Sequence, residues 1–147
     1  MEKDGLSVGD FVLLLLNLRK KCQNEQEENL SQTEALHYAH FRLWIEDIDE
    51  RQALRLLNRQ TAARIIHNFL RIECGLPDLP DISAAKNLKD LYTCRLCANH
   101  IAQVYERGIM PACELDEEGV FFNHLGILSK KEIEEIIKTM KKIMKNM

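Results

Sequence analysis

The sequence is poor in aromatic residues, proline and glycine. Aromatic side chains make up 6% of its 147 residues, and there are only 3 prolines and 6 glycines. An all-β fold needs frequent turns, and proline and glycine are among the residues that form them. Segments in which polar and apolar residues strictly alternate are also missing. We therefore expect little or no sheet.

Long hydrophobic runs are missing as well. The most apolar stretch covers residues 11–16, whereas a membrane-spanning helix needs about 20 such residues. The sequence therefore predicts no membrane insertion. Its first residues are acidic, and no basic region followed by a small-residue cleavage site is present, so we expect no signal peptide. Two interpretations stay open: a cytoplasmic protein, or the mature part of an exported one.

An excess of positive charge is also lacking, because the net charge is −3. This argues against a nucleic-acid-binding module, which relies on cations to neutralise phosphates. The nearest approach to a basic face is four lysines near the C-terminus, Lys138, Lys141, Lys142 and Lys145. We interpret them as residues that complement the negative end of a helix dipole.

The five cysteines are an odd number without the spacing of a small disulfide scaffold, which favours reduced thiols. Cys94 and Cys97 have the spacing of a zinc half-site or of a redox pair. A second half-site is missing, and Cys97 falls on an apolar helix face. We therefore expect buried free thiols at these two positions.

The histidines predict neither a metal site nor a catalytic site. His37 and His40 share a helix face, but the sequence offers this pair no carboxylate partner. His67, His100 and His124 have no acidic residue close to them in the sequence. A glycine-rich phosphate loop and a nucleophile–base pattern are missing too. We therefore expect no catalytic residue, no metal and no cofactor.

Helical periodicity and capping signals predict an all-α fold with about five main helices. The expected helices are Leu6–Lys21, one from Ser31, one from Asn58 to a stop at Gly75, one at about Cys94–Arg107, and one from Ser129. The first of them is apolar on nearly every side, so it should be the central element. The expected loops are Cys22–Asn29, Glu46–Arg55 and Pro111–Ile127, with a proline-containing connection at 76–84.

Three segments of the chain resemble one another: residues 6–11, 57–62 and 128–133. Each has a leucine, a helix-capping residue, two or three polar positions and then a strongly apolar helix. A helix and a loop precede the second and third of these segments. A helix, a loop and a capped helix that recur along a chain predict a repeat architecture, in which each unit buries its face against the next.

This arrangement resembles S-layer homology repeats. Their pattern is a helix that ends in Gly-Ile or Trp-Ile, a loop with a phenylalanine, and a second helix opened by Leu-Thr-Arg-x-Glu. The resemblance covers a partial repeat at 6–21 and repeats at 31–75 and 81–147, within a single domain over residues 1–147.

The opening motif of the second helix is matched only in part. Arg59 stands at the signature arginine, with Asn58 in place of threonine, while Ser129 and Lys130 are conservative replacements in the third repeat. Val8 removes the cation from the first repeat.

The resemblance implies a helical array that binds acidic, pyruvylated cell-wall polysaccharide and anchors proteins to Gram-positive cell surfaces. The ligand-binding residues would then be Arg59, Lys130 and Trp44, with Asn58 and Ser129 beside them. Cations and the free N–H groups of helix starts are suited to carboxylates. The simpler alternative is that Asn58 and Ser129 only cap helices and that Trp44 only packs in the core.

The sequence thus predicts a non-catalytic module for cell-envelope attachment or for protein assembly. The alternative is a cytoplasmic helical regulator that binds DNA or a protein partner. The helix from Asn58 carries several arginines, but the charged loop before it is too long for a helix-turn-helix. Because the first repeat is incomplete, a homodimer that covers the first helix is a further possibility.

Overall fold

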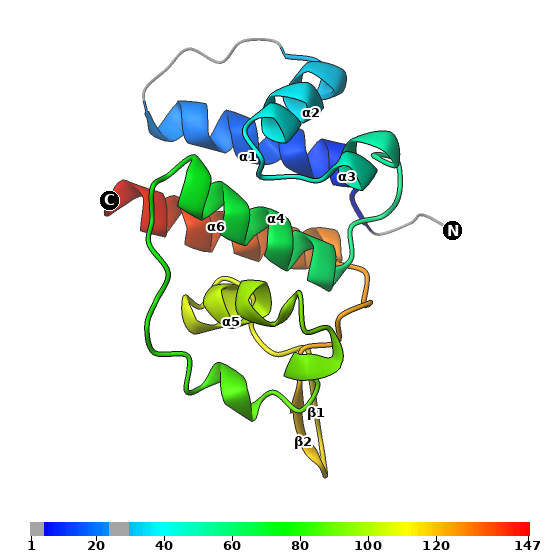
Figure 1. Cartoon of the computed structure of the whole chain (residues 1–147), viewed down its shortest axis with the longest axis vertical. Helices are drawn as coiled ribbons and strands as arrows, with labels where there is room; N and C mark the ends of the chain where they lie inside the picture. The colour runs from blue at the N-terminus through cyan, green and yellow to red at the C-terminus, as the bar shows by residue number, and fades with distance from the viewer. Residues whose placement is uncertain (1–4, 24–29) are drawn as a thin grey trace. The chain divides into compact units, whose positions relative to one another are not determined.

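The computed structural model describes residues 5–23 and 30–147 of the chain. The chain divides into two compact units: unit 1 comprises Met1–Leu57 with Leu128–Met147, and unit 2 comprises Asn58–Ile127. Figure 1 labels the helices and strands of both. Most of the expected polar linker Cys22–Asn29 lies outside the described residues, since only its first two residues are included. The prediction of a single domain over residues 1–147 stays a prediction.

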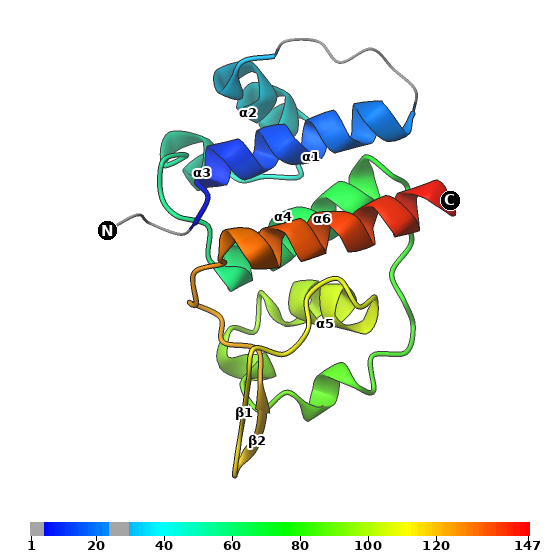
Figure 2. The same ribbon diagram turned by 180° about the vertical axis from the view of Figure 1, so that it is seen from behind.

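Unit 1 contains four helices: α1 (Val8–Cys22), α2 (Gln32–Phe41), α3 (Asp47–Arg51) and α6 (Lys130–Lys145). Helix α1 contacts the other three, and its Phe11 and Leu15 are completely buried. The expectation that this apolar helix is a central element is therefore confirmed within unit 1. Figures 1 and 2 show that α1 and α6 run in the same direction.

The helix starts of unit 1 follow the capping signals in the sequence. Ser31 Oγ accepts a hydrogen bond from the Glu34 N–H, and the Glu34 carboxylate accepts one from the Ser31 N–H. Ser129 and Glu132 make the same reciprocal pair at the start of α6. Both predicted capping boxes are thus confirmed. Each one satisfies backbone N–H groups that the helix itself cannot pair.

The three leucines that open the repeated segments meet in unit 1. The Leu57 N–H donates to the Leu6 carbonyl at 2.8 Å, and the Leu128 N–H donates to the Leu57 carbonyl at 3.2 Å. Leu57 and Leu128 are completely buried. Helices α1 and α6 begin shortly after the outer two leucines of this row. The first residues of the three similar segments therefore lie side by side.

The expectation that residues 46–55 form a surface loop is wrong, because α3 lies there. Asp49 is completely buried. Its carboxylate accepts hydrogen bonds from the Glu46 N–H at 2.8 Å and from Arg55 Nη2 at 2.6 Å. A helix of 5 residues is shorter than the window in which helical periodicity can be recognised. The charged composition of the segment therefore indicated a loop although a helix is present.

Unit 2 contains α4 (Arg59–Ile72), the 3-10 helices η1 (Ala85–Asn87) and η2 (Leu91–Thr93), α5 (Ala98–Glu106), and strands β1 (Glu114–Asp116) and β2 (Gly119–Phe121). Helices α4 and α5 pack together, and the strands form an antiparallel hairpin within the expected loop 111–127. Gly75 and Gly108, with φ of 65° and 74°, follow α4 and α5 as predicted. Glycine has no Cβ and adopts such angles at little steric cost.

Side chains of α5 hold the connection that leads away from α4. The Gln103 amide accepts from the Leu79 N–H at 2.8 Å and donates to the Leu79 carbonyl at 3.1 Å. Arg107 Nη2 donates to the Pro77 carbonyl at 2.6 Å. These bonds give the irregular, proline-containing segment the partners that regular secondary structure would otherwise supply.

The all-α prediction is confirmed, because helices dominate the described residues and the small hairpin is the one sheet in them. Five of these helices have nine residues or more, as expected. Within residues 5–23 and 30–147, no helix has the length and apolar character that crossing a bilayer demands.

We expect Asp49→Ala to lower the free energy of unfolding by about 2 to 3 kcal/mol, because Arg55 and the Glu46 N–H would lose a buried acceptor. Urea unfolding followed by circular dichroism measures this. The matched control is Asp47→Ala, since the exposed pair of Asp47 with Arg51 contributes at most about 0.5 kcal/mol. Equal stability of the two variants would contradict a structural role for Asp49.

Candidate functional site

Arg59 lies in the interior of unit 2 and not on its surface. Its side chain is 3% exposed. Nε donates to the Phe122 carbonyl at 2.7 Å, Nη2 donates to the Pro111 carbonyl at 2.5 Å, and the guanidinium lies 4.5 Å from the centre of the Phe122 ring. Contrary to the expectation from the resemblance, this cation holds the backbone of a loop and is not presented to a ligand.

Three of the other four residues predicted to bind a ligand have structural roles. Trp44 is 0% exposed, so it packs in the core and offers no platform to a sugar. Asn58 Oδ1 accepts from the Thr61 N–H at 2.8 Å, and Ser129 caps α6. These three therefore follow the simpler alternative. Lys130 is exposed at the first residue of α6.

The N-terminus of α4 also differs from the anion-binding helix start that the resemblance implies. The N–H of Arg59 donates to the Gly126 carbonyl and that of Gln60 to the His124 carbonyl, both at 2.9 Å. The third N–H, of Thr61, is paired with the Asn58 side chain. A carboxylate of a ligand would have to displace these internal hydrogen bonds, so this helix start is closed to anions.

Asp90 organises the loop that closes the start of α4. Its carboxylate accepts hydrogen bonds from the N–H groups of Phe122 and Asn123, both at 2.8 Å. Asn123 has a φ of 64°, in the left-handed region. Burial raises the pKa of Asp90, but the two N–H groups and the nearby His124 lower it more, so that the pKa lies below its ordinary value. The group is therefore a charged acceptor at neutral pH.

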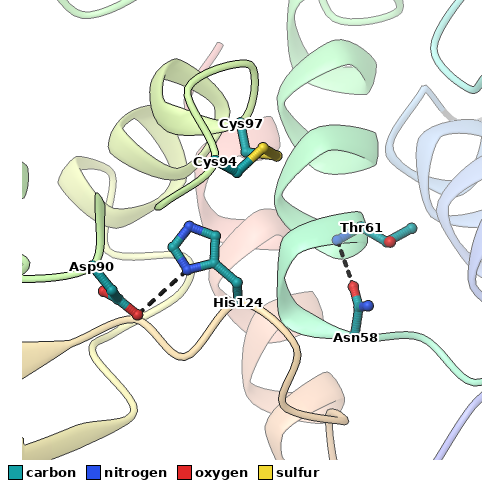
Figure 3. The surroundings of a disulfide bond; sticks show 6 residues. All are labelled: Asn58, Thr61, Asp90, Cys94, Cys97 and His124. Atoms are coloured by element: carbon teal, nitrogen blue, oxygen red, sulfur yellow. Dashed lines mark hydrogen bonds and ion pairs between the residues drawn. A yellow bond between two sulfur atoms is a disulfide. The ribbon is translucent and has the colours of Figure 1, made fainter. Parts of the chain in front are cut away.

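His124 pairs with Asp90, and both belong to the surroundings of a disulfide bond (Figure 3). The ring is 6% exposed, and Nδ1 lies 3.4 Å from Asp90 Oδ2. The other ring nitrogen, Nε2, is buried and has no hydrogen-bond partner among the described residues. Because an ionised carboxylate only accepts, Asp90 orients the ring with a proton on Nδ1.

The disulfide joins Cys94 and Cys97, so the expectation of free thiols there is wrong. Residues 94–97 form a turn in which the Cys97 N–H donates to the Cys94 carbonyl at 3.1 Å. Helix α5 begins only after this turn and not at Cys94 as predicted. The turn brings the two Cα atoms within 5.2 Å of each other, a separation suited to a disulfide. The remaining three cysteines form no disulfide.

A second histidine cluster in unit 2 joins α4, the connection after it and α5. His67 Nε2 lies 2.6 Å from Asp78 Oδ1, and His67 Nδ1 lies 2.8 Å from His100 Nδ1. The second oxygen of Asp78 accepts from Asn99 Nδ2 at 3.1 Å. Sequence reasoning missed the cluster, because its members come together only when α4 and α5 pack against each other.

The environment of this cluster keeps His100 neutral at physiological pH. Burial lowers the pKa of His100 to about 4, with further lowering from the charges of His67, Arg64 and Arg71. Burial raises the pKa of Asp78, but the hydrogen bonds from His67 and Asn99 outweigh it, and the pKa is lowered overall. The ionised Asp78 therefore accepts the hydrogen bonds that hold this cluster together.

In unit 1, the structure supplies the carboxylate partner that the sequence did not offer to His37 and His40. Glu50 of α3 pairs with the Nδ1 atoms of both rings, at 2.7 Å from His40. The carboxylate thus joins α2 to α3. Within the described part of the chain, no group of three or more His, Cys, Asp or Glu side chains is arranged to hold a metal ion.

A groove with two adjoining hollows, of about 310 and 150 Å³, lies between α1 and α6 in unit 1. Its lining comprises Leu14, Asn17, Leu18, Lys21, Ile133, Glu134, Ile137, Lys138 and Lys141. The aliphatic side chains form an apolar floor, and lysines from both helices stand at its edges. Asn17 Oδ1 is buried there and has no hydrogen-bond partner among the described residues.

Comparison with protein-family models, with curated proteins and with solved structures gives no match for this chain. The resemblance to S-layer homology repeats therefore stays a prediction.

We expect Arg59→Ala to destabilise the protein by about 3 kcal/mol, because two loop carbonyls would lose a charged donor. Lys130→Ala, at an exposed position, should change the free energy of unfolding by less than about 0.5 kcal/mol. Thermal and urea unfolding of both variants measure the difference. A folded Arg59→Ala protein with the stability of the parent would show that the arginine is not structural.

Stability should fall as the pH drops from 6.5 to about 4 because of His100. The unfolded chain takes up a proton on this residue near pH 6.5, whereas the folded chain does so only near pH 4. The contribution of His100 is therefore complete above this window and is lost across it, by about 1 to 2 kcal/mol with solvent screening. Urea unfolding of the wild type and of His100→Gln from pH 4 to 7 tests this. Parallel profiles would contradict the assignment.

Proposed function

We propose that the chain is a non-catalytic helical module for protein assembly that binds an acidic amphipathic helix in the groove between α1 and α6. The observation that carries the proposal is the combination of an apolar floor with lysines at the edges of one groove. An isolated exposed leucine needs no explanation. Apolar side chains that line a groove together are typical of an interaction site.

The shape of the groove suits a helix. It lies between two helices that run in the same direction (Figure 2), and a third helix that lays its apolar face into such a groove is a common mode of recognition. Leu14 and Ile137 would contact that face. Asn17 Oδ1, which lacks a partner in the described residues, would accept a hydrogen bond from a polar side chain of the partner.

The charge around the groove determines which helix fits. Lys21 is exposed at the end of α1, and Lys138 and Lys141 are one helical turn apart on α6. The floor between them is aliphatic. Glutamate or aspartate residues at the edges of the partner's apolar face would pair with these lysines. Such complementary charges favour specificity and fast association.

The three similar segments support one part of the prediction, namely a scaffold similar to S-layer homology repeats. The row of backbone hydrogen bonds through Leu6, Leu57 and Leu128 joins the first residues of the three similar segments. The position of Arg59 in the interior favours a protein ligand over an acidic polysaccharide. Cell-envelope attachment, with a cell-surface location, is the alternative that the experiment below distinguishes.

We expect an 18-residue amphipathic helical peptide with glutamates beside its apolar face to bind the chain, as fluorescence anisotropy would measure. The double variant Lys138→Glu, Lys141→Glu should bind it at least about tenfold more weakly, because complementary charges become repulsive. The matched control on the same helix is Lys142→Glu, Lys145→Glu. It changes the net charge equally outside the groove and should bind like the wild type.

Further arms of the experiment separate the alternatives. A peptide of the same composition in scrambled order should not bind. Equal binding by the two double variants would contradict the groove. Retention of the chain on Gram-positive cell-wall sacculi that is lost when their polysaccharide is stripped would overturn the protein-partner proposal in favour of wall attachment. Sedimentation at high concentration would show whether a second copy of the chain occupies the groove instead.

A further inference from the structure

We propose that the Cys94–Cys97 disulfide is redox-active and exchanges with a dithiol of a protein or small-molecule substrate, with His124 as the proton-transfer group. This site belongs to unit 2 and does not depend on the groove of unit 1. Four features carry the proposal: the spacing of the two cysteines, their place before a helix, their different exposure, and a buried histidine nitrogen without a partner.

The two cysteines differ in accessibility as an exchange reaction requires. Cys94 is partly exposed, whereas Cys97 is buried. The turn also presents apolar surface, since Leu96 is 91% exposed and Tyr92, just before the turn, is 61% exposed. A substrate thiol can therefore approach Cys94, and the surrounding apolar side chains can contact the substrate chain. The buried Cys97 would be the resolving cysteine.

Cys97 occupies the N-cap position of α5, a helix of 9 residues in which no side chain caps the first turn. The N–H groups and the dipole of a helix start stabilise a thiolate. When the disulfide opens, the sulfur of Cys97 would therefore leave as a stabilised anion. A leaving thiol with a low pKa leaves faster, and a stabilised reduced form makes a disulfide more oxidising.

His124 is the second and independent observation. Figure 3 shows its ring with Nδ1 turned to Asp90 and with the opposite edge, which carries Nε2, turned to the side on which the disulfide lies. The ring is 6% exposed, and Nε2 has no hydrogen-bond partner among the described residues. A buried polar atom without a partner is costly. At this place it is suited to transfer a proton to Cys97, the buried sulfur of the pair.

The exchange proceeds in two steps. The first substrate thiol loses its proton to the solvent, and the resulting thiolate attacks Cys94 Sγ. A bond forms between the substrate sulfur and Cys94, the Cys94–Cys97 bond breaks, and its electron pair goes to Cys97. The Cys97 thiolate then receives a proton from the solvent through His124 Nε2. The second substrate thiol, which also loses its proton to the solvent, then attacks the substrate sulfur of the mixed disulfide and releases Cys94, which takes up a proton from the solvent.

The net reaction is balanced. The substrate dithiol becomes a disulfide, and Cys94 and Cys97 become two thiols. Two electrons and two protons thus move from the substrate to the chain. Oxidation of the chain by a disulfide of another molecule is the reverse of the same two steps.

The test uses the full oxidised chain with dithiothreitol as the probe. The reaction is quenched at intervals with iodoacetamide, and mass spectrometry of peptides follows reduction at Cys94 and Cys97. We expect reversible reduction in the folded chain, and a rate at least about tenfold lower in His124→Gln. The wild-type rate should depend on pH with an inflection that the His124→Gln profile lacks. The control His37→Gln, in unit 1, should react like the wild type.

A second measurement identifies the attacked sulfur and does not need the His124 variant to fold. Partial reaction of the wild type with the monothiol 2-mercaptoethanol, followed by peptide mapping, should place the adduct on Cys94. Three results would overturn the proposal: a disulfide that resists dithiothreitol in the folded chain, an adduct on Cys97, or a folded His124→Gln variant with the rate and pH profile of the wild type.

Discussion

The carboxylate of Asp90 is the constraint on which the organisation of unit 2 depends. It fixes the N–H groups of Phe122 and Asn123 and orients His124. The loop held in this way places the carbonyls of His124 and Gly126 on the first N–H groups of α4. The Phe122 carbonyl of the same loop accepts from Arg59. A single partly buried charge thus determines the loop geometry, the cap of a long helix and the position of a guanidinium.

The same principle operates in unit 1, where Asp49 is completely buried. Its oxygens accept from a backbone N–H at the start of α3 and from Arg55. Irregular backbone cannot satisfy its own polar groups, and a buried group without a partner is costly. In both units an aspartate supplies the missing acceptors. This explains how a chain with few glycines and prolines can form ordered connections.

The two units offer different chemistry. The groove of unit 1 combines aliphatic side chains with lysines, which suits non-covalent binding of an acidic helix. Unit 2 has a disulfide in the turn 94–97 and, on another loop, a histidine that a carboxylate orients, which suits electron and proton exchange. The two proposals rest on separate observations, so either can hold without the other. A binding module with a redox-active disulfide would be able to couple its interactions to the thiol state of its surroundings.

The sequence by itself determined the helix starts at Ser31, Asn58 and Ser129, the stops at Gly75 and Gly108, and the all-α class. These features depend on residues at most a few positions apart, so a local reading finds them. Only the tertiary structure decided that Arg59 and Trp44 are buried, that acidic partners reach His67 and His124, and that Cys94 pairs with Cys97. Asp78 and Asp90 are 11 and 34 residues from the histidines they bind. Contacts of this kind depend on how the chain packs, and no local pattern of residue types encodes them.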